Sequence, residues 1–178
     1  MRRVVVLSLA ILAIAGGCKK KPLSQDPNVA NKVVVRPVTL FFEGPEMLLV
    51  REMRNVALPE NPAGALSQVA RELLKGSANA GVPPIFPRDT VVRATFLLPD
   101  GTAFVDLGGA TLAQGWGTGS HEELMAVYSL VQTISANFPE AKRVRILVNG
   151  TPAETLAGHV ALDRSLVPSA AFVDPRAR

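Results

Sequence analysis

The stretch AQGWGTGSHEEL, residues 113–124, determines whether this chain of helices and strands contains a phosphate-binding loop or only the start of a helix. A glycine-rich loop that opens a helix can bind phosphate, or it can simply lead into a capped helix. A dinucleotide fingerprint needs G-x-G-x-x-G directly after a strand and an acidic residue about 20 positions later. Here the glycines are spaced G-x-G-x-G, seven residues separate Leu107 from Gly115, and neither that acid nor a Gly-Lys-Ser/Thr sequence follows. The stretch therefore predicts a helix start.

The residues after the glycines support this interpretation. Ser120 and Glu123 have the spacing of a capping box, in which each side chain accepts a backbone N–H bond at the helix start. Glu122 and Glu123 also supply the negative charge that a helix N-terminus favours, and they would repel a phosphate. We expect a helix over residues 121–137.

Strands and a second helix are predicted on both sides of this segment. Asn61 as N-cap, Pro62 at the first helical position and Gly76 after the last turn delimit a helix with one apolar face. Runs of β-branched and aromatic residues predict strands. These runs lie at residues 38–42, 47–56, 90–98, 102–107 and 143–150, the third and fourth forming a hairpin.

Composition argues against a nucleic-acid binder. The 178-residue chain carries a formal charge of +4, but five of its 19 Lys and Arg residues lie within the first 21 positions. The remaining 14 face 15 Asp and Glu, so the body of the chain is close to neutral. A nucleic-acid-binding domain carries its basic residues on the folded surface.

The N-terminal charges belong to a predicted export signal. Arg2 and Arg3 precede the apolar stretch 4–15, which is too short to span a bilayer but has the length of a signal-peptide core. Gly16-Gly17-Cys18 is similar to the lipobox of bacterial lipoproteins, although Ala15 stands where leucine is usual. An ordinary signal peptide with an incidental cysteine is the alternative. Lipidation of Cys18 with acyl chains such as palmitate would account for a lone cysteine in an exported chain.

The segments of the chain follow from this assignment. Residues 1–17 are the predicted signal peptide, 18–32 the lipidated cysteine and a disordered tether, 33–167 the folded domain and 168–178 a flexible tail. The expected location is the extracytoplasmic face of a cell membrane, with the membrane as a partner through Cys18. Lys19, in place of the aspartate that often retains lipoproteins at the inner membrane, favours the outer membrane in a cell that has two.

Candidate chemical sites are few, and we expect no catalytic, cofactor-binding or metal-binding residues. His121 and His159 lack neighbours at metal-ligand spacing, and nothing brings Asp106 together with Glu43 and Glu52. Asp106 is interpreted as a residue that caps or turns the chain. Trp116, between two glycines, is the candidate interaction residue, with packing over the adjacent helix as the alternative.

Six short motifs follow one another along the predicted domain: Leu-Val…Arg, Leu-Leu-x-Gly, an Ile/Pro/Thr loop, Val-Asp-Leu, Thr before Phe-Pro, and Glu-Thr-Leu-x-Gly-His. They are carried by Leu49, Val50, Arg54, Leu73, Leu74, Gly76, Ile85, Pro87, Thr90, Val105, Asp106, Leu107, Thr133, Phe138, Pro139 and residues 154–159. In their order and spacing they resemble the GerMN domain, which is named from a sporulation and germination lipoprotein. Departures are Gly108 in place of Ser, Gln132 in place of Asn, and Gly76-Ser77 in place of Gly-Pro.

The resemblance, over about residues 38–167, implies the fold and a class of function. It implies a single α+β domain, a mixed sheet with two helices packed on it, similar to ring-building motifs of secretion and sporulation machines. It also implies assembly at the cell envelope through an unidentified protein partner, without catalysis. The alternative is a lipoprotein that binds a small molecule or a cell-wall glycan, with Trp116 at the mouth of its site.

Overall fold

The computed structural model describes residues 32–177. The predicted signal peptide, Cys18 and the tether up to residue 31 therefore lie outside the described residues. Within residues 32–177, no helix is both long enough and apolar enough to cross a bilayer.

The first two strands form a long antiparallel ribbon of their own. Strand β1 (Val33–Glu43) pairs over its full length with β2 (Leu49–Pro59), so that Val33 lies opposite Pro59 and Glu43 opposite Leu49. Both predicted strands are confirmed, although β1 begins five residues before the predicted start. The additional residues are three consecutive valines, Arg36 and Pro37, which are exposed and carry no inward-outward alternation that could signal a half-buried strand.

Helix α1 (Pro62–Leu74) is bounded as its sequence predicts. The Asn61 side chain accepts a 2.6 Å hydrogen bond from the Gly64 N–H, and Pro62 occupies the first turn. Gly76 follows the helix with φ of 86°, a left-handed conformation that glycine adopts without steric cost.

The remaining strands form a second, mixed sheet. Its order is β3 (Val91–Leu97), β4 (Thr102–Gly108), β5 (Arg143–Val148) and the two-residue β6 (Thr151–Pro152). The predicted hairpin is β3–β4, whereas β4 and β5 run parallel and are joined by a crossover that contains α2 (Ala110–Ala113) and α3 (Ser120–Asn137). The predicted Asn149-Gly150 turn between β5 and β6 is confirmed, with both residues at positive φ.

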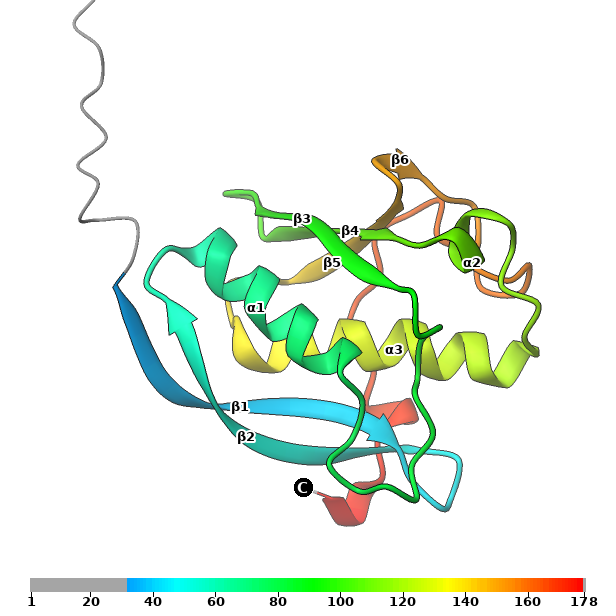
Figure 1. The fold of residues 1–178 in the computed structure, drawn as a ribbon, viewed down its shortest axis with the longest axis horizontal. Coiled ribbons are helices and arrows are strands. Elements are labelled where there is room, and N and C mark those ends of the chain that lie inside the picture. The colour runs from blue at the N-terminus through cyan, green and yellow to red at the C-terminus, as the bar shows by residue number, and fades with distance from the viewer. Residues whose placement is uncertain (1–31, 178) are drawn as a thin grey trace, which may run out of the picture.

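The long helices α1 and α3 lie between the two sheets. Figure 1 shows the β1–β2 ribbon on one side of α1 and α3 and the four-stranded sheet on the other. The predicted class is confirmed, a single α+β domain whose mixed sheet has two helices packed on it. What differs is that the first two strands do not join that sheet. Their separation has a physical cause at the outer edge of β1.

Helix α3 takes the place of a third strand at that edge. The Asn137 side-chain amide exchanges two hydrogen bonds with the backbone of Thr39, at 2.9 and 2.7 Å. Two residues further along β1, the Phe41 N–H donates to the Thr133 hydroxyl at 3.1 Å, and the Ser129 hydroxyl donates to the Phe41 carbonyl at 2.6 Å. Because these polar residues recur every four positions, they form one stripe along α3. The stripe satisfies backbone groups that a strand would otherwise pair.

The C-terminal residues are part of the domain, which corrects the prediction of a flexible tail over 168–178. Two short 3₁₀ turns, Ala170–Phe172 and Pro175–Ala177, follow the last strand. The Phe172 ring lies 4.1 Å from the Tyr128 ring between centroids, and the Asp174 N–H donates to the Leu49 carbonyl at 2.9 Å. Two prolines suggested a loose segment, but Phe172 and Val173 gain apolar contacts on the core.

Candidate functional site

Glu123 does not cap its own helix, so the predicted capping box is wrong. Gly119 is the N-cap residue of α3, and no side-chain cap bond forms there. Ser120 is already the first helical residue and is exposed. Glu123 is instead completely buried, with a relative exposure of 0%. The spacing of a capping box was present, but a different set of backbone donors binds the carboxylate.

Those donors belong to the loop that follows β6. The carboxylate accepts four backbone N–H bonds, from Leu156 at 2.7 Å, Ala157 at 2.9 Å, His159 at 2.7 Å and Val160 at 3.2 Å. Each oxygen receives two of them. Hydrogen bonds to a charged group are stronger than neutral ones, and they offset the cost of burying the charge. The Glu-Thr-Leu-x-Gly-His motif therefore serves the fold, because it surrounds a buried glutamate from another element.

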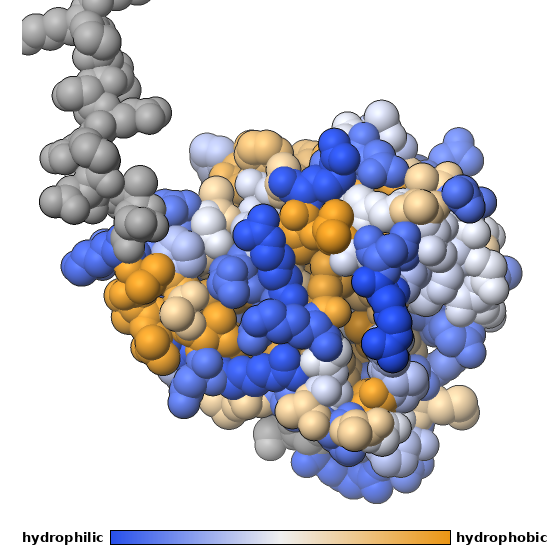
Figure 2. All heavy atoms as spheres, viewed as in Figure 1, coloured by the Kyte–Doolittle hydropathy of each residue, from blue (hydrophilic) through white to orange (hydrophobic). Residues whose placement is uncertain are grey.

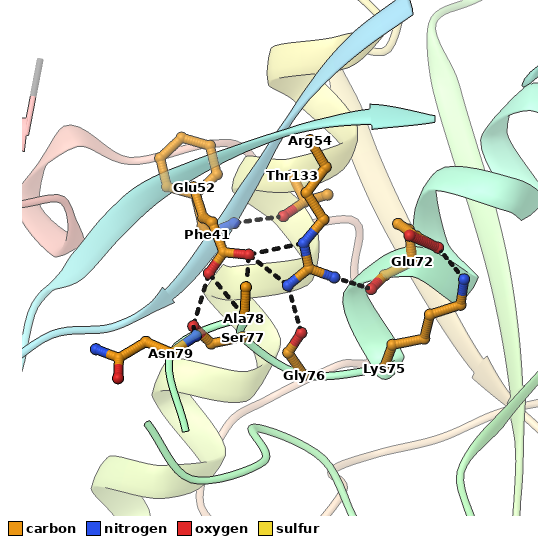
Figure 3. A network of polar contacts seen from close by, with 10 residues as sticks. All are labelled: Phe41, Glu52, Arg54, Glu72, Lys75, Gly76, Ser77, Ala78, Asn79 and Thr133. Atoms are coloured by element: carbon orange, nitrogen blue, oxygen red, sulfur yellow. Dashed lines mark hydrogen bonds and ion pairs between the residues drawn. The ribbon is translucent and has the colours of Figure 1, made fainter. Parts of the chain in front are cut away.

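Arg54 also joins two elements through hydrogen bonds, at the place where β2 passes the C-terminus of α1 (Figure 3). Its guanidinium donates to the carbonyl of Gly76 at 2.6 Å and to that of Glu72 at 3.4 Å, which are among the carbonyls at the helix end. It also pairs with the Glu52 carboxylate and lies 5.5 Å from the centroid of the Phe42 ring. Arg54 thus holds α1 against the ribbon.

Glu52 completes this network through the loop after α1. Its carboxylate accepts a 2.6 Å bond from the Ser77 hydroxyl and 3.2 Å bonds from the Ala78 N–H (Figure 3). Burial raises the pKa of Glu52, but the hydrogen bonds from Ser77, Arg54 and Ala78 together lower it below its ordinary value. The residue is a structural anion at neutral pH.

Asp106 has the turn-forming role that its position predicts. One carboxylate oxygen accepts a 2.8 Å bond from the Gly150 N–H, in the turn after β5, and the other lies 3.2 Å from the Arg93 Nε. Glu43 and Glu52 have partners of their own elsewhere, so the structure does not bring the three carboxylates into one cluster.

The two histidines also have separate partners. His121 Nε2 lies 2.8 Å from a carboxylate oxygen of Glu43, and His159 Nε2 lies 3.3 Å from the Thr118 carbonyl. The contact of His121 joins α3 to the end of β1, which sequence spacing could not reveal because 78 positions separate the residues. Among residues 32–177, no group of three or more potential metal ligands lies together.

Trp116 packs on the domain. Its ring is half-buried against the core and stacks on Phe86, with 6.3 Å between centroids and 23° between planes. The backbone N–H of Trp116 donates to the Leu156 carbonyl at 3.3 Å. The ring partner, Phe86, lies in the loop before β3, and the interaction role of Trp116 remains a prediction.

Hollows on the described surface are small. Five stand out, with volumes of about 150–320 Å³, and Trp116 lines none of them. Ligand pockets for drug-sized molecules usually have volumes of about 300–1,000 Å³ and enclose most of the ligand. The geometry therefore favours a surface over a cavity as the functional feature.

One such surface is the open face of the four-stranded sheet, which is the face turned away from α1 and α3. On β4 the alternate residues Ala103, Val105 and Leu107 are fully buried toward the helices. The residues between them point to the other face. There Phe96 of β3, Phe104 of β4 and Arg145 of β5 lie directly opposite one another across three strands. Residues paired in this way share one face of a sheet and contact each other.

Apolar and basic side chains dominate this open face. Phe96 is 55% exposed and Leu98 is 44% exposed, while Phe104, Leu147 and Arg145 are half-buried. Arg143 and Arg145 form no ion pair with any residue that the structure describes. Hydrogen bonds from Thr102 are the main cause that lowers the pKa of the nearby Asp100 carboxyl, and the positive charge of Arg143 contributes to the same shift. Aromatic residues and arginine are enriched in protein interfaces and among the residues that dominate binding energy.

Sequence reasoning did not single out this face. The alternation of arginine with Val144 and Ile146 in β5 was a usable signal, because it separates a buried face from an open one. The alignment of Phe96 with Phe104 follows from the tight turn between Leu98 and Thr102, whereas the β-bulge between Val92 and Ala94 shifts only the pairs farther from that turn.

These features define a small α+β domain whose mixed sheet is packed on helices with one face and open on the other. The chain belongs to the family described as Germane, sporulation and spore germination, which matches residues 39–154. The predicted resemblance is thereby confirmed. No curated protein sequence matches the chain.

Solved structures agree on the fold. The first GerMN domain of the sporulation protein GerM from Bacillus subtilis matches with 18% identity and a TM-score of 0.51, over 80% of this chain and 98% of that one. The tandem GerMN domains of the same protein match with 20% identity and a TM-score of 0.52, over 75% of this chain. This chain spans about half of the tandem protein, 46% of its length. At these identities the likeness concerns the fold alone.

Proposed function

We propose that this chain is a lipid-anchored protein of the cell envelope whose domain binds another envelope protein, without catalysis, through the open face of the four-stranded sheet. The observation that supports this most is the row of Phe96, Phe104 and Arg145 across three strands. A soluble domain has no structural need for an exposed phenylalanine at the end of such a row, which is where Phe96 lies. An apolar patch with a polar rim is typical of a binding surface.

The chemistry of the face indicates its partner. The two phenylalanines and Leu98 offer apolar contact area, and Arg145 offers a guanidinium without an ion-pair partner among residues 32–177. A surface with a hydrophobic ridge flanked by a carboxylate would complement both. Such a face is small, so the isolated domain is expected to bind weakly.

The anchor compensates for weak binding. The apolar stretch 4–15 followed by Gly16-Gly17-Cys18 supports cleavage before Cys18 and attachment of lipid to its thiol. Two or more acyl chains give stable membrane attachment where one does not. Confinement of both partners to one membrane raises their effective concentration. We place the protein on the extracytoplasmic face, at the outer membrane where the cell has two.

Two experiments test the proposal. The Cys18→Ser variant should take up no acyl analogue and remain uncleaved, and equal labelling of variant and parent would rule out the anchor. With the anchor intact, Arg145→Glu should reduce pull-down of the partner while leaving the melting temperature within a few degrees. Undiminished pull-down would rule out the open face as the binding surface.

One observation favours the alternative of a small-molecule or glycan ligand. Thr90 is only 7% exposed, and its hydroxyl has no hydrogen-bond partner among the described residues. It lines a hollow of about 270 Å³ together with Arg71 and Lys75, which could receive a carboxylate or a sugar hydroxyl. Titration with soluble cell-wall fragments would show saturable binding that Thr90→Val weakens. Equal binding by both proteins would exclude this hollow.

A further inference from the structure

The N-terminal end of the β1–β2 ribbon is an apolar tip that α3 does not cover. The hydrogen bonds from α3 to the outer edge of β1 reach Thr39 and Phe41, but no residue nearer the start of the strand. Beyond them Val33, Val34 and Val35 are 55%, 47% and 66% exposed. Figure 2 shows this end of the ribbon as a cluster of hydrophobic spheres at the start of the described chain.

Both faces of the tip are apolar. Because successive side chains of a strand point to opposite faces, Val33 and Val35 lie on one face and Val34 on the other. A folded protein that docks on a sheet covers one face and leaves the other in water. Exposed valines on both faces suit insertion at the boundary between headgroups and acyl chains, where lipid can contact both faces at once.

Basic residues flank the valines. Lys32 precedes them and Arg36 follows them, and both are exposed. Glu60 neutralises Lys32 in part through a 2.8 Å contact at the surface, whereas Arg36 has no ion pair in residues 32–177 and lies 5.9 Å from the centroid of the Phe138 ring. An apolar surface bordered by Lys and Arg is the composition that binds anionic lipid headgroups.

A strand of another protein is a less suitable occupant. The outer edge of β1 offers the backbone groups of the odd-numbered residues, since the even-numbered ones pair with β2, as Lys32 does with Glu60. Pro37 lies on this edge and has no N–H to donate, so a strand added along Val33–Pro37 would lose part of its ladder.

The position of the tip in the chain identifies its partner. Lys32 is 14 residues from Cys18. A chain of that length reaches at most about 50 Å, so the tip can lie at the surface of the bilayer that holds Cys18. We propose that the tip formed by Val33–Val35, with Lys32 and Arg36, lies in the headgroup region of the bilayer to which Cys18 is anchored. This inference rests on the proposed lipid anchor, and it would orient the domain with the ribbon end toward the membrane.

Depth-dependent fluorescence quenching tests the tip in the lipidated protein. Cys18 is the only cysteine of the chain, and its thiol is consumed by the lipid, so an introduced cysteine is the only free thiol. Val34→Cys and Val35→Cys are each labelled with a small fluorophore and reconstituted into vesicles that contain anionic and brominated lipids. Met53→Cys is the matched control, because Met53 is 70% exposed on the same face of the same ribbon as Val35.

The expected result is strong quenching at positions 34 and 35 and weak quenching at 53. Equal, weak quenching at all three positions in protein that is demonstrably acylated would overturn the inference and leave the anchor standing. Weak quenching at either position 34 or position 35, together with disulfide-linked dimers of the unlabelled Val35→Cys protein, would overturn it in favour of a second copy of the chain on one face. Failure of acylation would remove the proposed function and this inference together.

Discussion

Glu123→Gln is expected to destabilise the domain by about 2–4 kcal/mol. Glutamine keeps one oxygen that can accept the bonds from Leu156 and Ala157, but its NH₂ group faces the N–H groups of His159 and Val160. Two donors then lose their partners, and each buried unsatisfied donor costs about 1–3 kcal/mol. The lower cost of burying a neutral amide offsets part of this loss.

Chemical and thermal unfolding of the variant measure this cost. For a domain of this size, each kcal/mol corresponds to about 2–4 °C, so the melting temperature should fall by about 4–16 °C. The emission of Trp116 should change as well, because its backbone N–H donates to the Leu156 carbonyl in the released loop and thereby holds the ring in place. The control is Glu122→Gln, which alters an exposed neighbour and should stay within about 0.5 kcal/mol of the parent. Equal stability of the two variants would refute the argument that the loop depends on Glu123.

Three other substitutions test the remaining contacts. Thr133→Val leaves the Phe41 N–H without its partner and should cost about 1–3 kcal/mol, with faster hydrogen exchange at Phe41; unchanged exchange would contradict the edge-covering role of α3. Since the pKa of Glu52 is lowered by folding, its contribution is present at neutral pH and is lost as the pH falls below the ordinary value of 4.5. Glu52→Gln should therefore flatten acid-unfolding curves in that range, and identical curves would disprove the assignment. Trp116→Ala should lower the melting temperature, because the ring stacks on Phe86; an unchanged midpoint with reduced partner pull-down would restore Trp116 as an interaction residue.

Local signals in the sequence were sufficient for the elements that local chemistry determines. Asn61, Pro62 and Gly76 delimit α1 because capping and left-handed backbone depend on residues adjacent in the chain. The turn at Asn149-Gly150 follows for the same reason.

Long-range partners were not predictable in this way. Glu123 has the spacing of a capping residue, yet its donors lie 33 to 37 positions later in the chain. The stripe on α3 that covers β1 looks like ordinary helix sequence, since the partners of Thr133 and Asn137 on β1 lie more than 90 positions earlier in the chain. The open sheet face required the register of three strands, which only the folded chain defines.

The central claim is that the open sheet face binds a protein partner at the membrane. Site-specific photo-crosslinking in intact cells tests it most directly, with a photoreactive side chain at position 96 and, for comparison, at position 53, where Met53 is 70% exposed on the separate β1–β2 ribbon. We expect a discrete crosslinked species in the membrane fraction from position 96, strongly reduced by Arg145→Glu, and none of that size from position 53. No crosslink at position 96, or the same species equally strong from position 53 and insensitive to Arg145→Glu, would contradict the claim.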